Sequence, residues 1–129
     1  MNLKDLHMPV THRFDSNIII IEMSGEYSID DVRTTILNSL AEASVKSRSC
    51  LLFNFGESRS IHVKDPKEIN TMVNFITSLA NRFSNRLAFV SYYALPYVLM
   101  RFVSVKSGSC GIDSEVFQTL DEARAWLLS

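Results

Sequence analysis

The stretch Ser49–Gly56, with the sequence Ser-Cys-Leu-Leu-Phe-Asn-Phe-Gly, decides the fold. It is a short apolar run that ends in glycine, and segments with helical periodicity lie on both sides of it. Short apolar runs between helices are typical of strands that are buried on both faces of a parallel sheet. We therefore expect Ser49–Gly56 to be a central strand around which the other elements are arranged.

Two strands and a helix are predicted before this segment. Residues 10–14 and 18–23 each favour a strand, the second because it contains four consecutive isoleucines. The short turn between them, Asp-Ser-Asn, predicts an antiparallel hairpin. A helix then begins at Ser28, which can cap it, and should end near residue 48. Its apolar residues recur at helical spacing and are Val32, Ile36, Leu40 and Ala43.

Three helices and two strands are predicted after the central strand. Asp65 begins the first helix, with Pro66 at its first position and Glu68 completing a capping box, and its apolar stripe runs to Phe83. Residues 86–92 favour a strand, residues 95–105 a helix, and residues 114–118 a short strand. A capping box at Thr119 begins the last helix, whose expected buried stripe is Leu120, Ala123, Trp126 and Leu127.

The predicted order of elements is β-β-α-β-α-β-α-β-α. Strands that alternate with helices pair in parallel through right-handed crossovers. We therefore expect one α/β domain over residues 1–129, with a mixed five-stranded sheet whose first strand is antiparallel and about four helices. Residues 18–21 and 87–90 are apolar on both faces of this sheet. Helices or a partner subunit must cover the second face, and we expect a homodimer.

Composition argues against several classes of function. The net charge of −1 arises from 13 basic and 14 acidic side chains, so no broad positive field favours nucleic acid. No apolar run reaches the roughly 18–20 residues that span a bilayer, and no signal peptide begins the chain, so we expect a cytoplasmic protein. Neither a metal nor another cofactor is expected, because the cysteines and histidines lack ligand spacing: Cys50, Cys110, His7, His12 and His62.

The end of the chain resembles a known family. Residues 115–127 are similar to the strand, capping box and Ala-Trp-Leu ending of SpoIIAA-like (STAS/SEC14-type) bacterial proteins. Leu87–Val90, with Tyr97 and Met100–Phe102, resembles the fourth strand and the following helix of that family. The resemblance covers most of the chain in the order of elements. It implies a β-α superhelix whose strands lie in the sheet roughly in sequence order.

The resemblance also implies a phosphorylation site. The anti-sigma-factor antagonists of this family carry an Asp-Ser-Ser-Gly motif after the third strand, where a serine is phosphorylated. In this chain the same place reads Gly-Glu-Ser-Arg-Ser-Ile, residues 56–61, and the motif is absent. The resemblance therefore leaves Ser58 and Ser60 as the candidate phosphorylation sites.

The loops that follow parallel strands gather at one edge of the sheet, where open α/β sheets usually bind ligands. The candidate ligand-binding residues at this edge are Tyr27, Glu57, Arg59, His62, Lys64, Tyr92, Tyr93 and Tyr97. Arg59, His62 and Lys64 are predicted to form an anion site near the beginning of the Asp65 helix. Alternatively, the tyrosines at positions 92, 93 and 97 and the helix over residues 95–105 wall an apolar pocket.

Three functions remain open on the sequence alone. The first is a non-enzymatic regulatory or protein-interaction domain of the SpoIIAA-like class, which acts through a protein partner or a small ligand at the loop edge. The second is a binding or carrier domain for an apolar small molecule or a lipid. The third is a small enzyme that uses His62, which is disfavoured because no phosphate-binding or nucleophile motif occurs.

Overall fold

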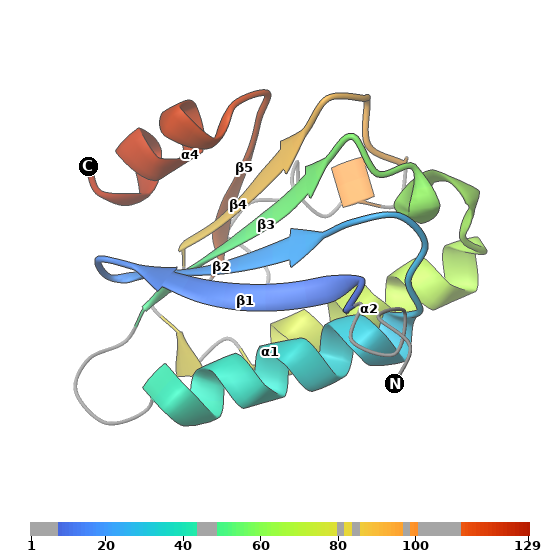
Figure 1. Ribbon diagram of the computed structural model, residues 1–129, viewed down its shortest axis with the longest axis horizontal. Helices are drawn as coiled ribbons and strands as arrows, with labels where there is room; N and C mark the ends of the chain where they lie inside the picture. The colour runs from blue at the N-terminus through green and yellow to red at the C-terminus, as the bar shows by residue number, and fades with distance from the viewer. Residues whose placement is uncertain (1–7, 44–48, 80–81, 84–85, 97–98, 101–111) are drawn as a thin grey trace, which may run out of the picture.

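The computed structural model describes residues 8–43, 49–79, 82–83, 86–96, 99–100 and 112–129 (Figure 1). Their order is β1 (Val10–Asp15), β2 (Ile18–Met23), α1 (Ile29–Ala43), β3 (Cys50–Gly56), the 3-10 helix η2 (Ser60–Val63), α2 (Pro66–Ser78), β4 (Arg86–Ser91), β5 (Asp113–Phe117) and α4 (Leu120–Leu127). The helix expected over residues 95–105 lies mostly outside the described residues, although Leu99 and Met100 are helical. Tyr97 also lies outside them.

The five strands form one sheet in the order β1-β2-β3-β4-β5. Strand β1 is antiparallel to β2, and each of the other neighbouring pairs is parallel. Residue Leu52 pairs with Ile20 on one side and with Ala88 on the other, so β3 lies in the middle of the sheet. The predicted mixed α/β sheet, with its strands in sequence order, is confirmed.

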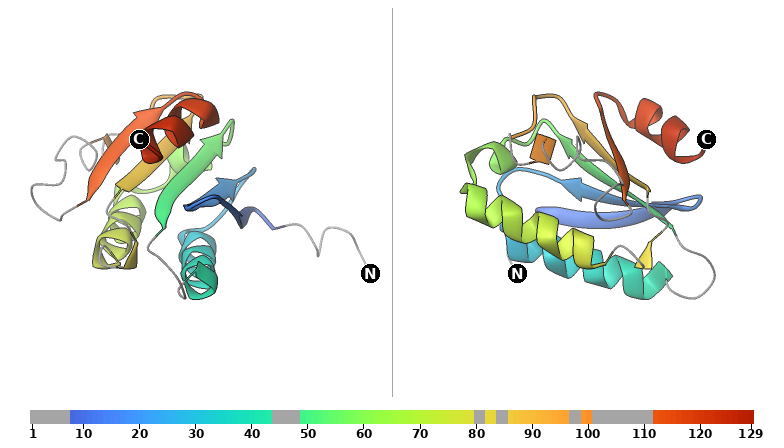
Figure 2. Two further views of the ribbon diagram at one scale, coloured as in Figure 1. Left: turned by 90° about the vertical axis from the view of Figure 1, so that its left-hand side faces the viewer. Right: turned by 180° about the vertical axis from the view of Figure 1, so that it is seen from behind.

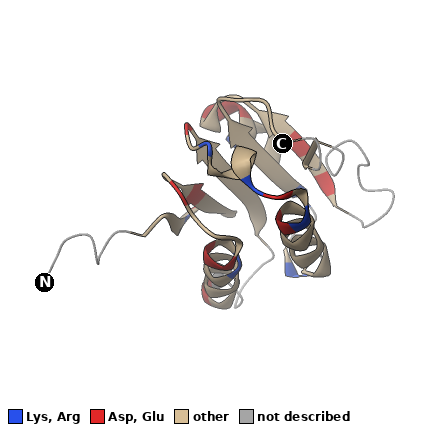
Figure 3. Ribbon diagram, turned by 90° about the vertical axis from the view of Figure 1, so that its right-hand side faces the viewer, with Lys and Arg blue, Asp and Glu red and all other residues tan. Residues whose placement is uncertain are grey.

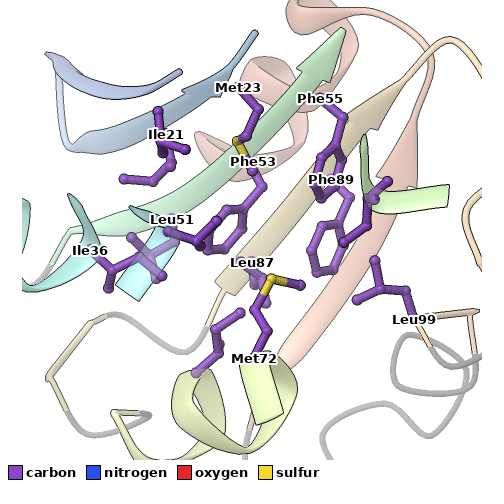
Figure 4. Close-up of a cluster of buried hydrophobic side chains, with 14 of the residues drawn as sticks. Ile21, Met23, Ile36, Leu51, Phe53, Phe55, Met72, Leu87, Phe89 and Leu99 are labelled. Atoms are coloured by element: carbon purple, nitrogen blue, oxygen red, sulfur yellow. The ribbon is translucent and has the colours of Figure 1, made fainter. Parts of the chain in front are cut away.

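Helices lie on both faces of the sheet. Figure 2 shows α1 and α2 beneath one face and α4 against the other. On the first face, the rings of Phe53 and Phe55 stack on Phe89, with centroids 5.6 and 6.1 Å apart (Figure 4). On the second face, Ala123 and Leu127 of α4 pack against a smaller set of buried residues: Ile18, Ile20, Cys50, Leu52, Ala88 and Val90. The chain therefore has two apolar cores that share the sheet.

Because α4 covers the second face of the sheet, that face no longer supports the prediction of a homodimer. Ile18, Ile20 and Leu52 have no solvent exposure within a single chain, because α4 covers the face to which they point. The sequence predicted that either helices or a partner subunit would cover this face, and a helix covers it. A homodimer stays a prediction, and it needs a surface other than this one.

Helix α4 is less deeply buried than its sequence indicates. Ala123 and Leu127 are buried, whereas Leu120 and Trp126 are half-buried at the margin of the core. The indole of Trp126 lies 5.7 Å from the Phe117 ring centroid, and the guanidinium of Arg86 lies 5.2 Å from the Trp126 ring centroid. The predicted buried stripe is thus confirmed at Ala123 and Leu127, whereas Leu120 and Trp126 are only partly buried because α4 is a short helix that lies over the sheet on its own.

Capping side chains fix where the helices begin. In α2 the Asp65 carboxylate accepts a 2.8 Å hydrogen bond from Lys67 N, and Glu68 Oε1 accepts one of 3.4 Å from Asp65 N. This is the predicted capping box, and it is confirmed. Helix α1 has the same reciprocal arrangement with an aspartate, since Ser28 and Asp31 each accept a hydrogen bond from the backbone N–H of the other. None of the described helices is long and apolar enough to cross a membrane.

The Asp65 cap is expected to stabilise the fold measurably. Asp65→Ala should lower the free energy of unfolding by about 1 kcal/mol, because the first turn of α2 loses a side-chain acceptor. The matched control is Asn74→Ala, at an exposed position inside the same helix, which should leave stability unchanged or raise it slightly. Urea denaturation midpoints that are equal for the two variants would contradict the assignment of the cap.

Candidate functional site

The candidate site lies where β2, β3 and β4 end. Strand β2 is followed by Gly25, with φ of 65°, and β3 ends at Gly56, with φ of 53°. Glycine adopts these left-handed angles without steric cost, so the chain can turn sharply away from the sheet at both points. The backbone N–H of Gly56 donates a 3.0 Å hydrogen bond to Asn54 Oδ1, which fixes the second turn. Figure 3 looks onto this edge and shows basic and acidic residues interspersed there.

Two buried serines join the loop after β2 to the loop after β3. The hydroxyl of Ser58 donates to the Gly25 carbonyl at 2.7 Å. The hydroxyl of Ser60 accepts from Tyr27 N at 3.2 Å and lies 3.3 Å from the Tyr27 carbonyl, to which it can donate. The ammonium of Lys64 donates to Ser60 Oγ at 3.2 Å and lies 5.0 Å from the Tyr27 ring centroid. We call the two serines with their backbone partners the serine clasp.

Tyr27 is buried beneath the serine clasp. Its side chain belongs to the main apolar core, and its hydroxyl has no hydrogen-bond partner among the described residues. Burial disfavours the charged phenolate and raises the pKa of Tyr27 well above its usual range. Tyr27 is therefore a neutral structural group at physiological pH.

Aromatic and basic side chains form the outer surface of the same edge. The guanidinium of Arg59 lies 4.1 Å from the Tyr93 ring centroid, and the His62 and Tyr93 rings are nearly perpendicular with their centroids 5.9 Å apart. Tyr92 is next to Tyr93 and is 68% exposed, and Val63 is 81% exposed. We call these five residues, Arg59, His62, Val63, Tyr92 and Tyr93, the edge patch.

The nitrogens of His62 are turned inward. Nε2 donates a hydrogen bond to the Ala94 carbonyl at 2.7 Å, which places the proton of the neutral ring on Nε2. Nδ1 is buried and has no partner among the described residues. The imidazole therefore ties η2 to the segment after β4, and neither nitrogen is available for proton transfer with a ligand in solution.

An open depression of about 640 Å³ lies between the two loops. The serines of the clasp lie in it, and charged side chains stand at its rim. Its lining residues are Met23, Ser24, Gly25, Glu26, Glu57, Ser58, Arg59, Ser60 and Val63. On the α4 side of the sheet, Tyr92 borders a second depression of about 550 Å³ with Asn54 and Gln118. The edge therefore has two open depressions that are lined by both polar and apolar groups.

The structure brings seven of the eight predicted site residues to one edge, and the eighth, Tyr97, lies outside the described residues. The seven are Tyr27, Glu57, Arg59, His62, Lys64, Tyr92 and Tyr93. Their side chains serve different purposes, however. The Tyr27 side chain is buried and Lys64 contacts Ser60 and the Tyr27 ring, whereas Glu57 and Arg59 line the depression.

The predicted anion site and phosphorylation sites remain predictions. Arg59, His62 and Lys64 each have a separate partner, namely the Tyr93 ring, the Ala94 carbonyl and Ser60 Oγ. Ser58 and Ser60 are buried and hydrogen-bonded, so a kinase would have to open the serine clasp to reach either hydroxyl. No group of three or more potential metal ligands occurs in the part of the chain that the structure describes.

Sequence reasoning missed Val63 and the serine clasp. A valine two residues after a buried isoleucine indicates a core position, so nothing in the sequence distinguishes Val63 from Ile61. The clasp joins residues 33 positions apart, and no local pattern encodes such a contact.

Comparison with known proteins supports the fold and leaves the activity open. No protein-family model matches the sequence, and no curated protein is significantly similar to it. Among solved structures, the chain is similar to the crystal structure of an uncharacterized protein of the DUF3478 family with a SpoIIAA-like fold from Shewanella loihica PV-4. The TM-score is 0.56 at 15% sequence identity, over 92% of this chain and 91% of that chain. The chain therefore has a SpoIIAA-like fold, as the resemblance of its last segment implied.

Removing the Tyr27 hydroxyl should change how stability depends on pH in the alkaline range. Because the folded pKa of Tyr27 is raised, the neutral phenol stabilises the fold fully below the unfolded pKa of about 10, and this stabilisation is lost as pH rises through the folded pKa. Tyr27→Phe should therefore weaken the fall of unfolding free energy above about pH 10. Urea denaturation of both proteins at neutral and alkaline pH measures the difference, and identical pH slopes would contradict the burial of an ionisable phenol.

The serine clasp should contribute to stability. Ser60→Ala removes the acceptor of the Tyr27 N–H and is expected to cost about 1–3 kcal/mol, since a buried donor is left unpaired. Ser24→Ala, at an exposed serine that lines the same depression, is the matched control and should change stability by less than about 0.5 kcal/mol. An equal shift in the denaturation midpoint for both variants would show that the clasp does not hold the loops.

Proposed function

We propose that this protein is a non-enzymatic regulatory domain that binds a protein partner through the edge patch. The observation that carries the proposal is the exposure of Tyr92 and Val63 beside an arginine that is stacked on Tyr93. Tyrosine and arginine are enriched among the residues that dominate binding energy at protein interfaces. An exposed group of large apolar side chains with a polar rim is typical of an interaction site.

The serine clasp supports this proposal because it fixes the loops that carry the patch. Ser58 and Ser60 hold the segment after β3 against the segment after β2, and His62 holds η2 against Ala94. A surface that is ordered before binding loses less conformational entropy when a partner arrives. The buried polar groups of this edge thus contribute rigidity, and the exposed ones are available for contact.

The alternative functions have weaker support. The 640 Å³ depression has Glu26, Glu57 and Arg59 in its lining, and an apolar molecule or lipid in it would remove these charges from water without pairing them. The helix expected to wall an apolar cavity lies mostly outside the described residues. A catalytic His62 is disfavoured because Nε2 is hydrogen-bonded and Nδ1 is buried. We retain the proposal that the protein is bacterial and cytoplasmic, which rests on the sequence alone.

Site-specific photo-crosslinking tests the proposal. A benzoyl-phenylalanine placed at position 92 should give a discrete adduct with one protein in cells of the source organism, because the partner covers Tyr92. The control is the same probe at position 37. Leu37 is 39% exposed and lies on α1, beneath the sheet and outside the edge patch.

A second substitution in the same chain makes the test specific to the patch. Val63→Asp should abolish the adduct at position 92, because it places a charge on the most exposed apolar residue of the patch without disturbing the core. Adducts that are the same from positions 92 and 37, or that persist with Val63→Asp, would contradict the proposed interface.

A further inference from the structure

Among the described residues, one side of the β1 backbone has no partner strand. It is the first strand in the sheet order and pairs along its whole length with β2, from Val10 opposite Met23 to Asp15 opposite Ile18. The register of this pairing has no bulge, and no proline interrupts residues 10–15. Bulges, prolines and outward charges are the devices that usually protect an edge strand from pairing with another chain.

The hydrogen-bond pattern shows which residues of β1 face outward. Ser24 N donates to the Pro9 carbonyl at 2.8 Å, so the backbone groups of Pro9 point toward β2. Backbone direction alternates along an antiparallel strand, which places the N–H and C=O groups of Val10, His12 and Phe14 on the outer edge. The Val10 carbonyl accepts a 3.4 Å hydrogen bond from Thr35 Oγ1 and has a second lone pair for another donor, whereas within the described part of the chain the outward groups of His12 and Phe14 have no strand beside them.

The side chains at this edge do not prevent pairing. Phe14 is 44% exposed, and its ring contacts the His12 ring with centroids 5.6 Å apart. The charge of Arg13 is directed along the opposite face of the sheet to Glu22, 3.2 Å away. His12 Nε2 lies 2.6 Å from Glu42 of α1, so the imidazole is held beneath the sheet and away from the outer backbone groups.

We propose that β1 pairs with β1 of a second copy of this chain, antiparallel and around a two-fold axis at His12. The two sheets then become one sheet of ten strands. His12 lies opposite His12 of the second copy, and Val10 lies opposite Phe14 of the second copy, which covers the exposed phenylalanine. This surface is separate from the edge patch, so the inference does not depend on the proposed function.

Charge and turn geometry select this register over its neighbours. A two-fold axis at Arg13 would put the two Arg13 side chains directly opposite each other, which is destabilising. An axis at Phe14 would pair His12 with Ser16, whose φ of 54° belongs to the hairpin turn and not to a strand. The register at His12 uses residues 10–14 of both chains and stops before Pro9, which has no N–H to donate.

Light scattering over a range of protein concentrations tests the pairing. The mass of the full chain should rise from 14.6 kDa toward twice that value as concentration increases. His12→Pro should hold the mass at the monomer value, because it removes an outward N–H that β2 does not use. His12→Ala keeps that N–H and should still dimerise, which separates backbone pairing from loss of the imidazole. A monomer at every concentration for the unsubstituted chain, or a dimer of His12→Pro, would overturn the proposal.

Disulfide trapping tests the register. The Cα atoms of a hydrogen-bonded antiparallel pair are about 5.5 Å apart, within the range that a disulfide spans. In a Cys110→Ser background, the His12→Cys variant should therefore form a covalent dimer under mild oxidation. The Phe14→Cys variant should not, because two Phe14 positions would be separated by about four residues along the strands, or about 13 Å. A covalent dimer of Phe14→Cys without one of His12→Cys would overturn the inference, and circular dichroism confirms that each variant is folded.

Discussion

Strand β3 buries apolar side chains on both of its faces, and this constraint shapes the whole molecule. Phe53 and Phe55 point into the core beneath α1 and α2, while Cys50 and Leu52 point into the core under α4. Burying one large apolar side chain stabilises a fold by roughly 1.5–3 kcal/mol, so leaving either face uncovered would cost several times that amount. The chain must therefore supply helices on both sides, and it does so with helices that follow β2, β3 and β5 in sequence.

The order of the strands then determines what kind of site is possible. Open α/β sheets commonly bind ligands in a crevice where the strand order reverses. Here the strands follow one another from β1 to β5, and no reversal opens such a crevice among them. The candidate surface is instead built by loops that the serine clasp and the hydrogen bond from His62 to Ala94 hold together. Its hollows are consequently shallow, which suits a broad contact better than an enclosed small molecule.

The sequence determined the elements of this fold more fully than it determined their contacts. Apolar periodicity predicted all five strands, and side-chain caps placed the beginnings of α1, α2 and α4, because both signals act between residues close in the chain. Trp126 was expected to be buried but is half-buried, because burial depends on how far a short helix extends over the sheet. The directions of Lys64 and His62 follow from partners about thirty residues away, Tyr27 and Ala94, which no local pattern specifies.

Contacts between residues that are distant in the sequence also determine which polar side chains at this edge are exposed. At this edge Ser58, Ser60, Lys64 and His62 each make a hydrogen bond that joins parts of the fold. The groups exposed at this edge include Tyr92, Val63, the outer side of Arg59 and the carboxylates of Glu26 and Glu57. They offer area, aromatic surface and charges of both signs, which are components of protein interfaces. Loops that are fixed by buried hydrogen bonds beneath such a surface support the protein contact proposed above.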